Sequence, residues 1–280
     1  MPLDRIQPKK SLGQNFLQDK NILRKITDVI AGNQGETLIE IGPGPGALTE
    51  FLLETELKYH GVEIDDRAIE ALYSHFRESD YPDFKIHKGD IRKFSVEEMI
   101  PAEILDTEKI KVVGNIPYNI SSDIFFWIFE QSRYISKTVL MVQKEVAQRL
   151  CAQPRTKAYG ILSVAADLIG SATIKFDVPP GCFFPKPRVV SAIIEIVFDK
   201  QQIDIADFKS IMQLVKASFS QRRKKIRNSS AQYIKEYYTL PPSEIQGKAE
   251  ESGLDYFTKR AEELSTEDYI KFYNFLRQFR

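Results

Sequence analysis

The chain has 280 residues, 42% hydrophobic and 28% charged, a length that suits one large domain or a large domain with a small one. Its longest uninterrupted apolar stretch covers only residues 124–129, which excludes a transmembrane helix of about 20 residues. Lys and Arg together number 39, as do Asp and Glu, so the net charge alone indicates no polyanionic partner. The two cysteines, Cys151 and Cys182, show no metal-ligand spacing, so we predict no metal site and a reducing, cytoplasmic location.

Alternating helix and strand patterns occupy the first two thirds of the chain. Apolar positions 22, 23, 26, 29 and 30 recur at helical spacing, and residues 37–41 then form a short apolar run that ends at glycines. Because strands separated by helical segments build parallel βαβ units, this order predicts an α/β, Rossmann-like fold. Further strands are predicted at 59–64, 84–87, 110–113 and 138–142, and further helices at 47–53, 67–76 and from about 122.

The pattern changes near residue 199. Residues 189–198 have the pattern of one last strand, and helical periodicity dominates from there to residue 280. Ser243 with Gln246, and Ser265 with Asp268, predict the N-termini of two helices. We therefore predict two domains, a Rossmann-like domain over 1–199 and a small all-helical domain over 200–280.

A glycine-rich loop follows the first predicted strand. Gly42, Gly44 and Gly46 allow the backbone to approach a ligand closely at the carboxyl end of the sheet. Glu63 lies at the end of the next strand, where an acidic residue can accept hydrogen bonds from both hydroxyls of a ribose. The loop and Glu63 together predict an adenosine-containing cofactor.

The details of the loop favour S-adenosylmethionine. The spacing is G-x-G-x-G rather than the G-x-G-x-x-G of nicotinamide enzymes, and no Walker-type Lys-Ser/Thr pair follows. Pro43 and Pro45 also remove backbone N–H donors that a pyrophosphate would use. Asp90, after the third strand, is placed to accept from the adenine amino group, although Gly89-Asp90 is also common in turns. A nicotinamide cofactor and a purely structural turn remain alternatives.

The stretch 114–119 after the fourth predicted strand is the most informative part of the sequence. Pro117 pushes Ile116 toward extended geometry, which can hold the Ile116 carbonyl beside the side-chain oxygen of Asn115. Two aligned acceptors suit an exocyclic amine with two N–H donors. Held in this way, the amine can direct its lone pair at a methyl group, and no strong base is needed.

Aromatic side chains in two segments are placed to hold a flat base against these acceptors. Tyr118 offers one stacking face, and Phe183 or Phe184, in a proline-bounded loop, can close the other side. The alternative is a strand-ending Asn-x-Pro turn with a packed tyrosine.

A basic run follows the first helix of the C-terminal region. Arg222, Arg223, Lys224 and Lys225 lie within a stretch, 216–227, that contains no acidic residue. A neutral protein with segregated charge can present such a run to nucleic acid. The alternative is a solvated helix face.

At this point the sequence resembles the KsgA-type ribosomal RNA adenine dimethyltransferases, and the resemblance extends from about Lys9 to the C-terminal helices. It rests on the glycine loop, Glu63, Asp90 and the Asn115 motif. Further characteristic stretches cover 10–17, 141–150, 157–160, 183–189 and 221–228. Departures are minor: Pro45 occupies a variable loop position, and Ile116 replaces the commoner leucine.

The resemblance implies a Rossmann-like methyltransferase domain with a helical RNA-binding domain. It implies dimethylation of N6 on two adjacent adenosines in a hairpin loop near the 3′ end of small-subunit rRNA, and a role in ribosome biogenesis. We expect the acceptor to be an immature 30S particle, with no membrane association, and the enzyme to act as a monomer in the cytoplasm. The site residues expected to bind S-adenosylmethionine are Asn15, Leu17, Gly42, Gly44, Glu63, Asp90 and Asn115. Those expected at the target adenine are Asn115, Pro117, Tyr118 and Phe183, and those expected to bind RNA are Arg222, Arg223, Lys224 and Lys225.

Two rival hypotheses remain open. A macrolide-resistance methyltransferase, which dimethylates one adenine of large-subunit rRNA, shares the cofactor motifs, although the stretches at 141–150 and 221–228 favour the small-subunit enzyme. A non-catalytic RNA- or transcription-associated relative is the other alternative, and the intact Asn115, Pro117 and Tyr118 argue against it.

Overall fold

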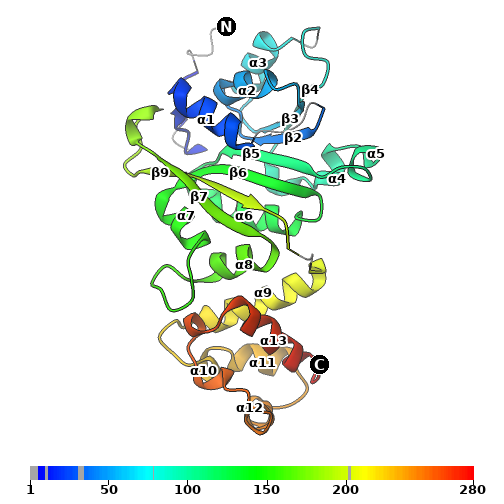
Figure 1. Cartoon of the computed structure of the whole chain (residues 1–280), viewed down its shortest axis with the longest axis vertical. Helices are drawn as coiled ribbons and strands as arrows, with labels where there is room; N and C mark the ends of the chain where they lie inside the picture. The colour runs from blue at the N-terminus through cyan, green and yellow to red at the C-terminus, as the bar shows by residue number, and fades with distance from the viewer. Residues whose placement is uncertain (1–5, 10–11, 31–34, 78, 201–202) are drawn as a thin grey trace. The chain divides into compact units, whose positions relative to one another are not determined.

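The computed structural model describes residues 6–9, 12–30, 35–77, 79–200 and 203–280, and these form two compact units (Figure 1). The first unit comprises Met1–Ala147 and Ser171–Asp199, and the second comprises Gln148–Gly170 and Lys200–Arg280. Within the described ranges, no helix combines the length and the apolar composition needed to cross a bilayer.

A seven-stranded sheet forms the centre of the first unit, with the strand order β4-β3-β2-β5-β6-β9-β7. The five strands on the β4 side run parallel, whereas β9 is antiparallel to both β6 and β7. The mostly parallel sheet predicted from the sequence is therefore confirmed. The strands are β2 (Thr37–Ile41), β3 (Lys58–Glu63), β4 (Phe84–Lys88), β5 (Ile110–Asn115), β6 (Ile135–Gln143), β7 (Ser171–Val178) and β9 (Ser191–Val197). A separate two-stranded ladder pairs β1 (Phe16–Leu17) with β8 (Phe183–Phe184).

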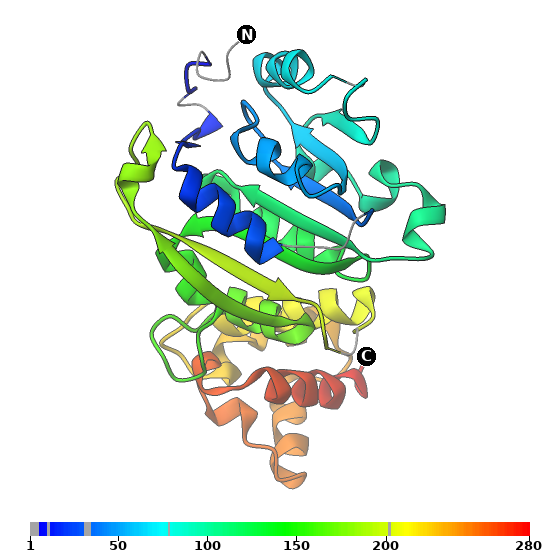
Figure 2. The same cartoon turned by 45° about the horizontal axis from the view of Figure 1, so that its top comes forward.

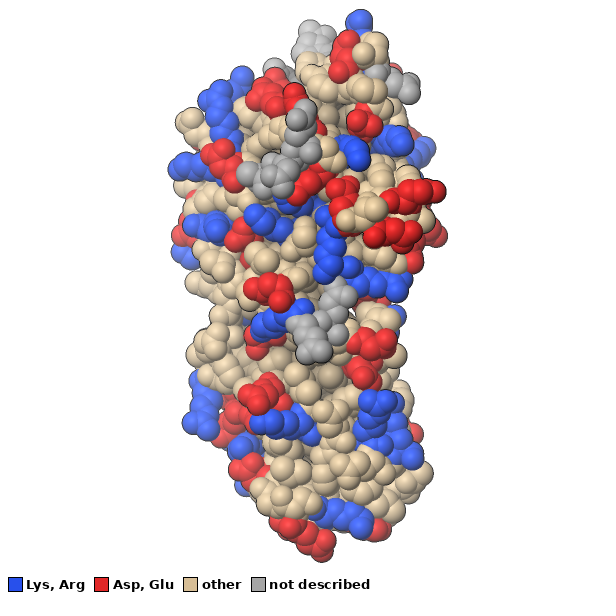
Figure 3. Space-filling view, turned by 45° about the vertical axis from the view of Figure 1, so that its right-hand side comes forward, with Lys and Arg blue, Asp and Glu red and all other residues tan. Residues whose placement is uncertain are grey.

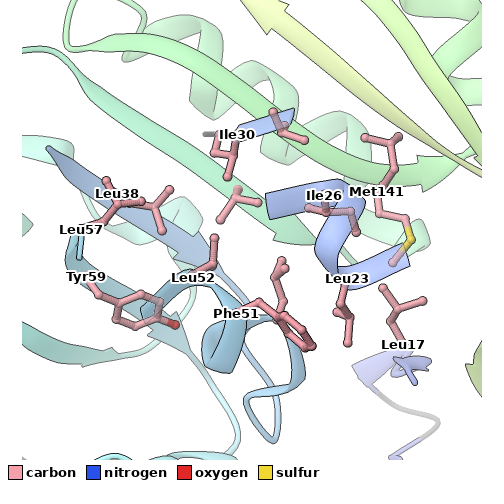
Figure 4. Packing of buried hydrophobic residues seen from close by; sticks show 14 of the residues in the cluster. Leu17, Leu23, Ile26, Ile30, Leu38, Phe51, Leu52, Leu57, Tyr59 and Met141 are labelled. Carbon is pink, nitrogen blue, oxygen red and sulfur yellow. The ribbon is translucent and has the colours of Figure 1, made fainter. Parts of the chain in front are cut away.

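Helices lie against this sheet, and α1 shows why they do so. Leu23, Ile26 and Ile30 lie three or four residues apart, so they form one apolar stripe, which is buried. Figure 4 shows this stripe beside Met141 of β6 and Leu52 of α2. Full burial of each such side chain contributes about 1.5–3 kcal/mol. The helices of this unit are α1 (Lys20–Ile30), α2 (Ala47–Leu53), α3 (Asp66–His75), α4 (Val96–Met99), α5 (Ala102–Leu105) and α6 (Ser121–Glu130), and α7 (Lys144–Leu150) spans the boundary with the second unit.

The second unit is helical, as the sequence predicts for its C-terminal part. Its longest helix, α9 (Ile205–Phe219), buries Phe208, Ile211, Met212, Leu214 and Val215. Buried tyrosines tie this unit together: the Tyr159 hydroxyl donates to the Leu264 carbonyl, and the Tyr269 hydroxyl donates to the Ala261 carbonyl. The other helices are α8 (Ile161–Ile169), α10 (Ile226–Ser229), α11 (Ala231–Tyr237), α12 (Pro242–Glu251) and α13 (Thr266–Arg277).

The compact units differ from the predicted boundary at residue 199 in one segment. Residues 148–170, predicted as part of the first domain, belong to the second unit. The reason is α8, which is apolar almost all round and packs against α9 and α13. A single domain boundary in the sequence cannot define a unit that is formed by two separate segments of the chain.

The two predicted helix starts had different outcomes. The capping box of Ser265 and Asp268 is confirmed at the N-terminus of α13. The start predicted at Ser243 is wrong, since α12 begins at Pro242 with Pro241 in the capping position. Proline suits the first helical turn because the missing N–H would have had no intrahelical partner.

Candidate active site

A pocket lies at the carboxyl ends of β2, β3, β4 and β5, which are neighbours in the sheet. The N-terminal segment that precedes β1 forms a further wall of the pocket. Eight predicted site residues come together here from five separate stretches of the sequence. They are Asn15, Gly42, Gly44, Glu63, Asp90, Asn115, Pro117 and Tyr118.

The glycine loop has the backbone geometry that the sequence predicts. Gly42 and Gly44 have φ angles of +68° and +56°, in the left-handed region that favours glycine. A Cβ atom on Gly44 would lie 3.1 Å from the ring of Phe16, so the loop and the N-terminal wall approach each other closely. The loop therefore requires glycine for both its dihedral angles and its packing.

The carboxylate of Glu63 is bound by three backbone N–H groups. Oε2 accepts from Gly44 at 2.9 Å, and Oε1 accepts from Ile64 and Asp65, each at 2.8 Å. Burial raises the pKa of Glu63, and these hydrogen bonds oppose that rise. Because a carboxylate offers about four acceptor positions, about one remains for a ribose hydroxyl in this arrangement.

Asp90 is bound by a neighbour that the sequence analysis did not identify. The guanidinium of Arg92 donates from Nη2 to Oδ2 at 2.6 Å and from Nε to Oδ1 at 3.0 Å, and its Nη1 reaches Asp123 at 3.0 Å. This pairing lowers the pKa of Asp90, so its carboxylate stays ionised and can act as an acceptor. Arg92 also lines the pocket. The sequence feature that could have identified it is its place two residues after Asp90, the acid that caps the 3-10 helix η3 (Ile91–Lys93).

Asn115 ends β5 with a defined side-chain orientation. Its Nδ2 donates to the backbone carbonyl of Asn15 at 2.8 Å. Since a carbonyl can only accept, the amide presents its NH₂ to Asn15, which leaves Oδ1 as an acceptor without a partner among the described residues. The preceding Gly114 allows β5 to approach β2, because a Cβ there would lie 2.6 Å from the Ile41 carbonyl oxygen.

Tyr118 is held by a serine from a distant segment. Its hydroxyl lies 2.6 Å from Oγ of Ser191, a residue with no exposed surface at the start of β9. Burial raises the pKa of Tyr118, so the hydroxyl remains protonated near neutral pH. Sequence reasoning missed Ser191, because only the tertiary fold brings β9 to the 3-10 helix η4 (Tyr118–Ile120).

Two of the residues predicted at the cofactor and the target adenine do not line this pocket. Leu17 and Phe183 are each 5% exposed and face each other in the β1–β8 ladder, where both belong to the hydrophobic core. Leu17 instead lines a smaller cavity that also includes Pro43. The roles of Leu17 and Phe183 stay predictions, and residues 10 and 11 of the N-terminal motif lie outside the described residues.

The basic run of the second unit lies in the turn between α9 and α10, not on a helix face. Arg222 is already engaged, since its Nε lies 2.6 Å from Oε2 of Glu262. Arg223, Lys224 and Lys225 are exposed, and the described part of the chain offers them no ion-pair partner. Elsewhere, acidic and basic side chains are interspersed over the face shown in Figure 3. Among the described residues, no cluster of His, Cys, Asp and Glu could hold a metal ion.

Comparison with known proteins identifies close relatives over nearly the whole chain. The family model described as "Ribosomal RNA adenine dimethylase" matches residues 5–277. A protein from Syntrophus aciditrophicus named "Ribosomal RNA small subunit methyltransferase A" is 40% identical over 225 residues, which is 80% of this chain and 79% of that protein. A protein of the same name from Francisella tularensis subsp. novicida is 37% identical over 269 residues, 96% of this chain and 97% of that protein.

Two solved structures show the same fold. A dimethyladenosine transferase from Plasmodium falciparum superposes with a TM-score of 0.76 at 24% identity, covering 91% of this chain and 95% of that chain. The 23S rRNA methyltransferase ErmE gives 0.64 at 23% identity, covering 94% of this chain and 100% of that chain. These likenesses confirm a Rossmann-like methyltransferase fold.

Proposed function

The chain belongs to the ribosomal RNA adenine dimethylase family, and from this premise we propose that it dimethylates N6 of two adjacent adenosines in a hairpin loop near the 3′ end of small-subunit rRNA. It is an S-adenosylmethionine-dependent rRNA adenine N6,N6-dimethyltransferase. The observation that carries the proposal is the orientation of Asn115: its Nδ2 is engaged by the Asn15 carbonyl, and the residue lines the same pocket as Glu63 and Asp90.

The polar groups of the pocket fit S-adenosylmethionine better than a dinucleotide. Glu63 and Asp90 are carboxylates, which accept hydrogen bonds from a ribose hydroxyl and an adenine amino group but repel phosphates. Arg92 is the one cationic side chain among the described lining residues, and it is already paired with Asp90 and Asp123. A nicotinamide cofactor would therefore lack charge compensation for its pyrophosphate.

The residues of the β5 end position the nucleophile. When bound, the cofactor supplies an electrophilic methyl group on a sulfonium sulfur. Oδ1 of Asn115 and the carbonyl of Ile116 accept hydrogen bonds from the two N–H groups of the adenine amine, and both residues line the pocket. Such orientation contributes about 7–11 kcal/mol to the barrier reduction. The amine proton leaves after attack, so the site needs no strong base.

The RNA is held by aromatic and basic groups. The ring of Tyr118 stacks on the target adenine, and in our proposal Phe183 closes its other face. Arg223, Lys224 and Lys225 contact the RNA phosphates. A loop adenine costs less to flip than a duplex base because it is already partly unstacked. We further propose that the acceptor is an immature 30S particle, and that the enzyme works in the cytoplasm as a monomer.

Methyl transfer to purified immature small subunits and to large-subunit rRNA, followed by mapping of the modified bases, tests this proposal. We expect two adjacent N6,N6-dimethyladenosines in the small-subunit rRNA and none in the large-subunit rRNA. Modification of large-subunit rRNA alone would assign the chain to the macrolide-resistance type instead. Asn115→Ala serves as the control. If this variant methylates rRNA as well as the wild type does, the activity comes from a contaminant in the preparations.

A further inference from the structure

The loop of residues 184–190, which runs from the last residue of β8 to the start of β9, exposes apolar surface beside positive charge. Phe184 is 52% exposed, whereas the neighbouring Phe183 is buried in the core. Val189 and Val190 are also among the exposed large hydrophobic residues of the described chain. Pro187 is buried and the Val190 carbonyl accepts from Lys144 N–H at 3.0 Å, so the loop is anchored at its middle and its end.

The charge on this loop is entirely positive. Lys186 and Arg188 are exposed, and no acidic residue occurs anywhere between residues 178 and 194. Neither cation has an ion-pair partner among the residues that the structure describes. An exposed ring followed in the sequence by two cations without ion-pair partners suits single-stranded nucleic acid, because bases stack on the ring while the cations bind phosphates.

Both ends of the loop are tied to the wall of the active-site pocket. Phe184 lies opposite Phe16 in the β1–β8 ladder, and Phe16 lines the pocket. At the other end, Ser191 holds the hydroxyl of Tyr118, which also lines the pocket. The loop therefore lies at the rim of the site that receives the target adenine in our proposed function.

We propose that residues 184–190 form a second base-binding subsite, in which Phe184 stacks on an unpaired nucleotide next to the target adenosine. Lys186 and Arg188 bind the phosphates on either side of that nucleotide. This inference rests on the proposed function, and it gives Phe184 a role separate from the one predicted for Phe183. RNA is favoured over a protein partner because the loop offers two cations and no acidic residue.

Substitutions at Phe184 separate base stacking from simple hydrophobic contact. Phe184→Ala should weaken binding to immature small subunits about 5- to 150-fold, the range for losing one aromatic stacking partner. Phe184→Tyr should bind like the wild type, and Phe184→Leu should resemble the alanine variant. Affinity for S-adenosylmethionine, measured by calorimetry, should stay unchanged in all three and shows that they are folded.

Matched controls use surface residues of the same unit. Tyr73, on α3, is 48% exposed, so Tyr73→Ala removes a ring of similar exposure away from the loop and should leave RNA binding unaltered.

Substitutions of the two loop cations test the proposed phosphate contacts. Lys186→Gln and Arg188→Gln should each reduce the slope of log affinity against log salt concentration by about 0.7, as expected for one lost contact with single-stranded RNA.

Three results would overturn the inference. They are an unchanged RNA affinity for Phe184→Ala, equal binding by the leucine and tyrosine variants, or a loss confined to assembled particles with binding to naked rRNA intact. The last result would indicate a ribosomal protein as the partner. If the wild type itself methylates no rRNA, the proposed function fails; if it does and Phe184→Ala is equally good, only the second subsite fails.

Discussion

Nδ2 of Asn115 donates a 2.8 Å hydrogen bond to the backbone carbonyl of Asn15, a residue 100 positions earlier in the chain. This bond determines which end of the amide faces the pocket. The side-chain oxygen of Asn115 is thereby oriented before any substrate arrives, which is the kind of preorganisation that lowers a barrier. The N-terminal segment thus orients the Asn115 side chain as well as lining the pocket.

The first prediction concerns this bond. Asn115→Ala should lower the single-turnover methylation rate about 10²-fold or more, because the adenine amine loses its oriented acceptor. Asn115→Asp keeps an oxygen but cannot donate to the Asn15 carbonyl, so it should be similarly impaired. The rates are compared at saturating S-adenosylmethionine. A near wild-type rate for Asn115→Asp would show that the bond to Asn15 is dispensable.

The second prediction concerns the Tyr118–Ser191 contact. Ser191→Ala and Tyr118→Phe each remove the same hydrogen bond, so each should reduce kcat/KM for RNA by about 2- to 10-fold. The double variant should lose little more than either single variant. Tyr118→Ala, which also removes the stacking face, should lose about 5- to 150-fold while cofactor affinity changes little. Fully additive losses in the double variant would contradict the coupling.

The third prediction concerns Glu63. Glu63→Gln replaces one acceptor oxygen by an NH₂ group that cannot accept from the backbone N–H groups around it. We expect about 5- to 150-fold weaker binding of S-adenosylmethionine by calorimetry, because leaving a buried donor unpaired costs about 1–3 kcal/mol. Glu50→Gln, on an exposed face of α2, is the matched control. Equal affinities for the two variants would remove Glu63 from the cofactor site.

The fourth prediction concerns Glu40, which is only 2% exposed and lines the smaller cavity together with Gly42 and Pro43 of the glycine loop. Its Oε2 accepts from Tyr59 at 2.6 Å and from Thr49 at 2.7 Å, and burial raises its pKa from 4.5 to about 7. The folded chain therefore binds this proton more tightly than the unfolded chain. The stabilisation from this group is complete below about pH 4.5 and is lost as the pH rises through about 7.

Glu40→Gln tests this dependence, since glutamine resembles the protonated acid at every pH. The free energy of unfolding of the wild type should fall relative to that of the variant between about pH 4.5 and 7, with a limiting slope of about 1.4 kcal/mol per pH unit. Denaturant titrations at several pH values measure the difference. Parallel stability curves for the two proteins would mean that Glu40 is ionised throughout.

The fifth prediction separates Arg222 from its neighbours. Arg222 pairs with Glu262 and donates to the Thr156 carbonyl, so Arg222→Gln should lower the stability of the second unit by about 0.5–1 kcal/mol. Arg223→Gln should leave stability unchanged and reduce the salt slope of RNA binding by about 0.7–0.9. The reverse pattern would make Arg222 the phosphate contact and Arg223 a structural residue.

Much of the site could be predicted because the features that indicate it lie within short segments of the sequence. Glycines at Gly42 and Gly44 indicate a backbone conformation that other residues rarely adopt, and Pro117 restricts the residue before it. The hydrophobic period of each segment indicates strand or helix, and the carboxyl ends of parallel strands meet at one edge of a sheet. Glu63, Asp90 and Asn115 follow from these rules, since Glu63 and Asn115 end their strands and Asp90 lies two residues after the end of β4.

The partners of these residues depended on contacts between distant segments. The Asn15 carbonyl, Ser191 and the engagement of Arg222 by Glu262 have no local signature, because each pairing spans at least 40 positions. Which phenylalanine is exposed also depends on strand register: successive side chains of a strand point to opposite faces, so pairing with β1 buries Phe183 and exposes Phe184. The sequence by itself determined which chemical groups reach the edge of the sheet. Only the tertiary structure decided how they are oriented, because orientation comes from hydrogen bonds and packing that long-range folding creates.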